Sequence, residues 1–169
     1  MHKGLLIPVG IGLVVMAIAV GGVLFIQRGA HIELDGKILK VRTAPLDENS
    51  SIAVADFRFT NPSNYPFLVR TVTMLMEDNS GMLYRGETVS ETDAKRLFEG
   101  YPLLGQKYNN SLIIRDNIPP HASWDRMIAA RFELSESQPQ PQKPPLEARK
   151  RFVVRIEEID GAVSELYEK

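Results

Sequence analysis

The feature that most constrains this chain is a run of residues without charge near its N-terminus. From Gly4 to Ile26 the sequence contains no Asp, Glu, Lys or Arg. As a helix, this run would extend roughly 35 Å, slightly more than the ~30 Å hydrocarbon core of a bilayer. A buried helix of a globular domain is rarely this long without one polar side chain. The run therefore predicts a transmembrane anchor, residues 1–29, that contacts the membrane through residues 4–26.

A cleaved signal peptide is the alternative interpretation, because Ala17-Ile18-Ala19 has the small-x-small form of a cleavage site. Cleavage there would leave apolar residues 23–26 at the new terminus, so the anchor is preferred. Lys3 favours a cytoplasmic N-terminus, whereas the basic residues from Arg28 onward favour the reverse. Long folded domains cross the membrane largely regardless of charge. We therefore expect a bacterial inner-membrane protein whose domain is periplasmic or otherwise extracytoplasmic.

Composition excludes several classes of function. The 20 Lys and Arg and the 21 Asp and Glu give a net charge of -1. Nucleic-acid binding requires clustered positive charge, so no nucleic-acid partner is expected. The absence of cysteine removes disulfides, thiol nucleophiles and Cys-type zinc sites. The sequence contains no pattern typical of a cofactor or metal site, so no cofactor or metal is expected. We also expect that the protein is not an enzyme.

Residues 30–169 have the alternation of β-strands. In Ile52 to Thr60, Ala53, Phe57 and other apolar residues share one face, while Asp56, Arg58 and Thr60 share the other. Further strands are predicted at 127–134, at 151–159 and at 162–167. A strand at 67–78 carries Arg70 among its apolar residues, which either a bulge or burial of both faces would explain. A strand at 32–43 has a bulge or a tight turn at Asp35-Gly36. Trp124 is expected to precede its strand.

Turns, one helix and one loop complete the prediction. Turn-forming residues lie at 61–66, at 78–81 and at Asp160-Gly161. Ser90 is a suitable N-cap for a short helix that presents Ala94, Leu97, Phe98 and Tyr101 on one side and ends at a Gly100 cap. Residues 135–147 are rich in Pro and Gln, and a mobile, extended loop is expected there. We predict an antiparallel immunoglobulin-like β-sandwich with one short inserted helix.

The stretch Phe57 to Met74, with Asn61-Pro62 between two strands, resembles late-embryogenesis-abundant domains of the water-stress-response type. Together with Glu77 to Tyr84 it also resembles bacterial single-pass membrane proteins that carry an immunoglobulin-like sandwich. The resemblance implies a fold, and it raises a lipid- or stress-protective role as one alternative function.

Candidate chemistry is sparse. His121, with Asp116 or Asp125 and with Ser111 or Ser123, would give a Ser-His-Asp hydrolase, although His121 reads as part of an exposed turn. Asp78-Asn79-Ser80-Gly81 is interpreted as a hairpin turn because it lacks calcium-loop spacing. Arg149-Lys150-Arg151 either approaches anionic lipid or is a solvated entry to a strand.

Apolar residues around the helix end form the candidate partner-contact surface: Leu97, Tyr101, Leu103 and Leu104. Capping of the core is the competing interpretation of these residues. The expected function is a membrane-tethered, non-enzymatic binding or scaffolding module of the bacterial envelope, with an envelope protein as partner. An envelope hydrolase using His121 and a lipid- or stress-protective domain are the alternatives.

Overall fold

The computed structural model describes residues 12–22 and 33–168. The chain divides into one unit at residues 1–32 and a second at residues 33–169, and each is described by itself. Residues 12–22 are helical and exposed. Within the described ranges, no helix combines the length and the apolar character needed to cross a membrane. The other residues of the predicted anchor, 4–11 and 23–26, lie outside those ranges.

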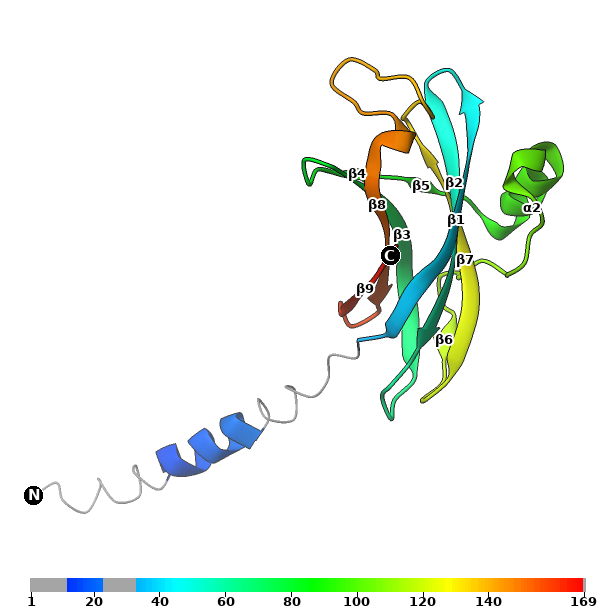
Figure 1. Ribbon diagram of the computed structural model, residues 1–169. Helices are drawn as coiled ribbons and strands as arrows, with labels where there is room; N and C mark the ends of the chain where they lie inside the picture. Colours follow the sequence, from blue (N-terminus) through cyan, green and yellow to red (C-terminus); the bar gives the residue numbers. More distant parts are fainter. Residues whose placement is uncertain (1–11, 23–32, 169) are drawn as a thin grey trace, which may run out of the picture. The chain divides into compact units, whose positions relative to one another are not determined.

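The second unit is mainly β, and its two main sheets are antiparallel, as the sequence predicts (Figure 1). One sheet has the strand order β1-β2-β7-β5. The other has the order β4-β3-β8-β9, and β6 pairs with the start of β3. The strands are β1 (Asp35–Asp47), β2 (Ser50–Thr60), β3 (Phe67–Asp78), β4 (Leu83–Arg85), β5 (Glu87–Thr88), β6 (Asn117–Ile118), β7 (Ser123–Phe132), β8 (Arg149–Glu158) and β9 (Val163–Tyr167).

The two sheets share an apolar core. Phe132 of β7 and Phe152 of β8 lie with their ring centroids 5.8 Å apart, and both side chains are buried. Along one side, the Leu34 amide donates to Ser164 Oγ at 2.8 Å and joins the start of β1 to β9. Removal of these large apolar side chains from water supplies most of the driving force for folding.

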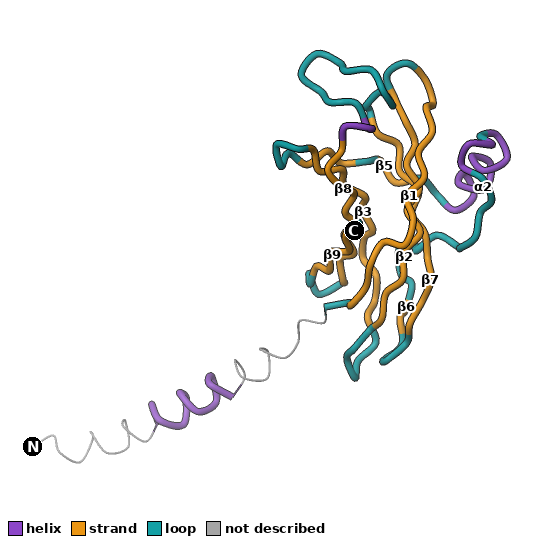
Figure 2. The backbone as a smooth tube through the Cα atoms, viewed as in Figure 1, coloured by secondary structure: helices purple, strands orange, loops and turns teal. Residues whose placement is uncertain are grey.

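The sheet β1-β2-β7-β5 also has a covered outer face, which corrects the expected exposure of that side of β2. Val54 is fully buried and Asp56 is 5% exposed. The cover consists of the helix α2 (Glu91–Gly100) and the 3-10 turn η1 (Pro102–Leu104). Figure 2 shows α2 on the side of this sheet that points away from β3 and β8. This sheet therefore packs on both faces, which simple alternation does not predict.

The predicted helix is confirmed, with a different end. Ser90 is its N-cap, and Ser90 Oγ accepts a hydrogen bond from the Asp93 amide at 3.1 Å. Its C-cap is Tyr101 instead of Gly100, because the Tyr101 amide still donates to the Leu97 carbonyl at 2.8 Å. The helix thus extends to its last intrahelical donor without needing a left-handed glycine.

Three details of the strands bear on the sequence predictions. Strand β7 begins at Ser123, so Trp124 lies within the strand and does not precede it. The ring centroids of Trp124 and Phe59 are 6.4 Å apart. The irregularity in β1 lies between Ile38 and Lys40 instead of at Asp35-Gly36. Of the two explanations for Arg70, the structure shows the bulge, as a register shift between Val69 and Thr71.

The Pro- and Gln-rich loop is closed, which corrects the expected extended excursion. The Leu146 amide donates to the Ser135 carbonyl at 2.8 Å, and both residues are buried. Gln140 and Lys143 exchange two backbone hydrogen bonds of 3.1 Å farther out. The apolar Leu146 therefore anchors a segment whose composition alone predicts no packing.

Candidate functional site

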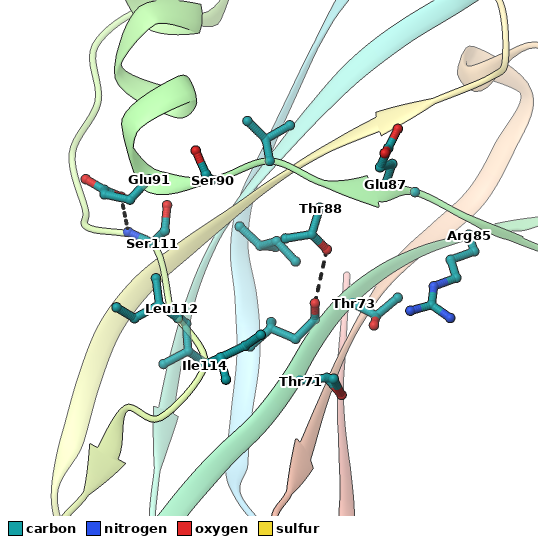
Figure 3. A pocket seen from close by; sticks show the side chains of 15 residues that line it. Thr71, Thr73, Arg85, Glu87, Thr88, Ser90, Glu91, Ser111, Leu112 and Ile114 are labelled. Carbon is teal, nitrogen blue, oxygen red and sulfur yellow. Dashed lines mark hydrogen bonds between the residues drawn. The ribbon is translucent and has the colours of Figure 1, made fainter.

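An open crevice of about 770 Å³ lies beside β5, between β3 and the segment 111–114 (Figure 3). This volume is in the range of small-molecule sites. The lining of the crevice includes three consecutive residues of β3, Thr71, Val72 and Thr73. The crevice therefore extends from the core across the edge of β3.

The crevice lies where the chain crosses, at Gly86, from β4 in one sheet to β5 in the other. The Gly86 amide donates to Met74 of β3 at 2.9 Å, whereas Thr88 already pairs with Ala130 of β7. A Cβ at Gly86 would lie 2.7 Å from Phe132 Cζ, so only glycine fits at this crossing. Beyond it, Thr88 Oγ1 reaches back to the Val72 carbonyl at 3.1 Å. The crevice lies between β5 and the edge of β3 at residues 71–73.

The opposite wall is the segment 111–114, held at both ends by backbone hydrogen bonds. The Leu112 amide donates to Met127 of β7 at 2.9 Å, and the Arg115 amide donates to Val69 of β3 at 2.8 Å. Between these anchors, Ile113 is 50% exposed and Ile114 is 62% exposed. Two adjacent isoleucines thus stand at the mouth, held by both sheets.

Six of the fifteen lining residues are aliphatic and eight are polar or charged, and most of the exposed lining surface is apolar. Val72, Leu112 and Ile128 are buried at the base of the crevice, and Val89, Ile113 and Ile114 complete the apolar surface. Ser111 Oγ, at the α2 end, is buried without a hydrogen-bond partner among the described residues. An apolar hollow with a few polar groups at its rim is typical of a ligand site.

Glu91, at the same end, is committed to structural bonds. Its Oε2 accepts from the Ser111 amide at 2.8 Å, and its Oε1 lies 2.8 Å from Lys107 Nζ. Burial opposes ionisation, but the hydrogen bonds from Lys107 and Ser111 outweigh it and hold the pKa of Glu91 at about 2. Glu91 therefore remains charged and bonded at neutral pH, where it fixes α2 to the 111–114 wall.

The other end of the crevice carries Arg85 and Glu87. Glu87 is the register partner of Arg131 on β7. Arg85 is exposed and forms no ion pair within residues 12–22 and 33–168. Its guanidinium is thus available to an anionic group at this end.

The structure does not bring the predicted hydrolase residues together. His121 Nε2 lies 3.0 Å from Asn64 Oδ1. Asp125 accepts two hydrogen bonds from Arg58, at 2.6 and 2.8 Å. Ser123 Oγ donates to the Phe59 carbonyl at 3.4 Å, and Ser111 lies in the crevice wall. The geometry of a triad, in which a base touches both nucleophile and acid, is not formed around His121.

The other two motifs have structural roles. Asp78 Oδ1 accepts from the Ser80 and Met82 amides, at 2.8 and 2.9 Å, which confirms the hairpin turn. Lys150 and Arg151 of the basic run both contact Glu77, and their hydrogen bonds lower the pKa of that carboxyl. Arg149 Nε also lies 3.7 Å from Glu168 Oε2, so each basic side chain of the run has an acidic partner within the domain.

Most of the candidate contact surface is used by the core. Leu104 is fully buried, so it is not available to a partner, and the capping interpretation is correct for it. Leu97 and Tyr101 are half-buried against the cluster beneath α2. Leu103 remains 75% exposed. The tight turn of η1 separates Leu103 from Leu104 in this way.

The crevice is not predicted by the sequence pattern. Its signal was the run Leu112-Ile113-Ile114 in turn-rich surroundings. A run of three aliphatic residues does not distinguish a buried strand from an exposed wall. Among the described side chains, no three His, Asp or Glu residues are grouped as metal ligands.

One buried acid gives a testable pH dependence. Glu158, at the end of β8, is 5% exposed, and burial together with Asp160 raises its pKa to about 7, from 4.5. The folded chain thus holds a proton that the unfolded chain releases. The free energy of unfolding is expected to be highest below pH 4.5, to fall as the pH rises to 7, and to level off above it, with respect to this group.

Urea denaturation at a series of pH values checks this expectation. Glu158→Gln, a mimic of the protonated acid, is expected to flatten the slope and to exceed the wild type in stability at about pH 8. Glu165→Gln is the control, since hydrogen bonds from Tyr167 and Arg155 lower the pKa of Glu165 and move its titration below this window. Identical pH profiles for wild type and Glu158→Gln would contradict the assignment.

No protein-family model matches this chain, and no curated protein matches it in sequence. The fold and the site therefore define the class. It is a two-sheet antiparallel β domain with an open aliphatic crevice where the chain crosses between its sheets.

Proposed function

We propose that this protein is a membrane-tethered, non-enzymatic binding module of the bacterial cell envelope, with the crevice beside β5 as its binding site. The crevice carries the proposal, because it combines ligand-sized volume with an aliphatic lining. Glu91, the acid at its α2 end, is held ionised by Lys107 and Ser111, which suits a structural role better than proton transfer.

The tether rests on the uncharged residues 4–26. A tether confines a binding module to the membrane surface and raises its effective concentration toward ligands there. We also infer that the two sheets form an immunoglobulin-like sandwich related to the water-stress-response type. The antiparallel pairing and the turn at Asn61-Pro62 support this inference.

A lipid- or stress-protective role is the second candidate function, and it is favoured by the apolar crevice at the sheet edges. The hydrolase alternative has no comparable support, since the ring of His121 meets Asn64. For an envelope protein partner, Leu103 is the exposed apolar residue that the predicted contact surface retains.

Fractionation of cells that express the full chain tests the tether and its orientation. The protein is expected to stay in the membrane pellet after an alkaline carbonate wash. In spheroplasts, added proteinase K is expected to digest the β domain, while a cytoplasmic control protein stays intact. Release by carbonate would overturn the tether, and protection until lysis would overturn the extracytoplasmic orientation.

A further inference from the structure

We propose that the crevice binds a single aliphatic acyl chain drawn from the adjacent membrane, with the acyl carboxylate at Arg85. This inference rests on the proposed tether and binding site, and it names the ligand class. Three observations carry it: the apolar lining, the charges at its two ends, and the short free edge of β3.

The lining favours methylene groups over other ligand chemistry. Its apolar side chains are all aliphatic, and no aromatic ring lines the crevice. Bases, aromatic rings and sugars are commonly held by stacking on aromatic side chains, which this site lacks. A flexible saturated chain needs only apolar contact, which Val72, Ile128 and the isoleucines at the mouth supply.

The charges place the head group. Glu91 is paired with Lys107 at one end, and its oxygens are occupied there. At the other end, neither Arg85 nor Glu87 forms an ion pair in the described part of the chain. Among the lining residues Arg85 is the cation, so its guanidinium is the charged hydrogen-bond donor for a carboxylate in the crevice.

The edge of β3 is too occupied to accept an added strand. Ile118 and Asn117 of β6 pair with its first two residues, and Arg115 bonds to Val69. Farther along β3, the Thr88 hydroxyl donates to the Val72 carbonyl, and the Gly86 amide donates to the Met74 carbonyl. Strand addition needs a series of free backbone groups, so an extended polypeptide has too few partners here.

Photocrosslinking of the full chain in phosphatidylcholine nanodiscs tests the proposal. The probe is palmitic acid with a diazirine in its chain, and mass spectrometry locates the adducts. Adducts are expected at 85–89, 111–114 and Ile128. Unlabelled fatty acids of 8 to 14 carbons are expected to compete about fourfold better for each added methylene, until the crevice is full.

Two variants distinguish binding in the crevice from nonspecific labelling of exposed apolar residues. Ile114→Glu is expected to reduce crevice labelling at least tenfold, because a charge would replace part of the aliphatic wall. Met82→Glu is the matched control, since Met82 is 58% exposed and does not line the crevice. Circular dichroism melts confirm that each variant is folded. Labelling that survives Ile114→Glu, or that spreads evenly to Met82 and Leu103, would overturn the proposal.

Two further variants test the orientation. Arg85→Gln is expected to weaken binding about tenfold, the loss of one charged hydrogen bond, whereas Arg96→Gln on α2 leaves binding unchanged. Unchanged labelling in Arg85→Gln, or an equal loss in Arg96→Gln, would overturn the placement of the head group.

The same sample keeps the two proposals apart. Adducts on residues 4–26 report insertion in the bilayer, independently of the crevice. Labelled residues 4–26 with an unlabelled crevice would overturn the acyl-chain inference and leave the tether in place. A labelled crevice without adducts on residues 4–26 would overturn the tether.

Discussion

Replacement of Asp56 by Ala is expected to lower the free energy of unfolding by about 3–5 kcal/mol, because it leaves a buried arginine without its counter-ion. Arg42 is 9% exposed, and its Nη2 lies 2.6 Å from Asp56 Oδ2. Arg42 Nη1 also donates to the carbonyls of Leu104 and Gln106, at 2.6 and 2.7 Å. The pair therefore holds the segment after α2 to the outer face of the sheet.

Urea denaturation at neutral pH measures this effect as a shift in the midpoint at constant slope. Asp125→Ala is the matched control, because Asp125 also pairs with an arginine of this sheet, Arg58, but both side chains are largely exposed. That loss is expected to cost less than about 1 kcal/mol. The double variant Arg42→Met, Asp56→Leu is expected to recover only part of the stability, because the carbonyls of Leu104 and Gln106 stay without their donor. Equal losses for Asp56→Ala and Asp125→Ala would contradict the role of the buried pair.

Asn61→Asp is expected to cost about 3 kcal/mol or more, because the new carboxylate would face carbonyl oxygens. Asn61 is fully buried. Its amide nitrogen lies 2.8 Å from the Tyr65 carbonyl, 3.2 Å from that of Ile118 and 3.3 Å from that of Pro119. One side chain thus joins the turn after β2 to the turn before β7.

Thermal and urea unfolding of three variants tests this arrangement. Asn61→Ala leaves the carbonyl groups unpaired and is expected to cost about 1–3 kcal/mol, less than Asn61→Asp. Asn64→Asp, in the same loop but exposed, is expected to change stability by less than about 0.5 kcal/mol. If Asn61→Asp were as mild as Asn64→Asp, the three-carbonyl arrangement would be wrong.

The turn at Asn61-Pro62 could be predicted from the sequence, but its contacts with a distant loop could not. Asn61-Pro62 marks a turn by its residue types alone, since Asn bonds locally and Pro stops a strand. Its contacts with Ile118 and Pro119 join residues 57 and 58 positions apart. No local signal encodes that pairing, so the turn was predictable and its role in joining two loops was not.

In the candidate site, too, the residue types are visible in the sequence, whereas their exposure depends on the tertiary structure. Ile113 and Ile114 are visible as an aliphatic pair, but their exposure depends on backbone bonds from Leu112 and Arg115 to two different strands. Leu103 and Leu104 are adjacent and chemically identical, yet one is 75% exposed and the other is fully buried. Only packing against the sheet distinguishes them, because it depends on the direction in which each side chain leaves η1.

By itself, the sequence determined the elements governed by local chemistry: the strands at 67–78 and 151–159, the turns between strands, and the Ser90 cap of the helix. Alternation, turn residues and capping act within a few positions, so they can be read from neighbours. The tertiary structure alone decided that the β1-β2-β7-β5 sheet is covered on both faces and that the chain crosses between the sheets at Gly86, between β4 and β5. Both depend on contacts between residues distant in the chain, where burial and close approach override the local pattern.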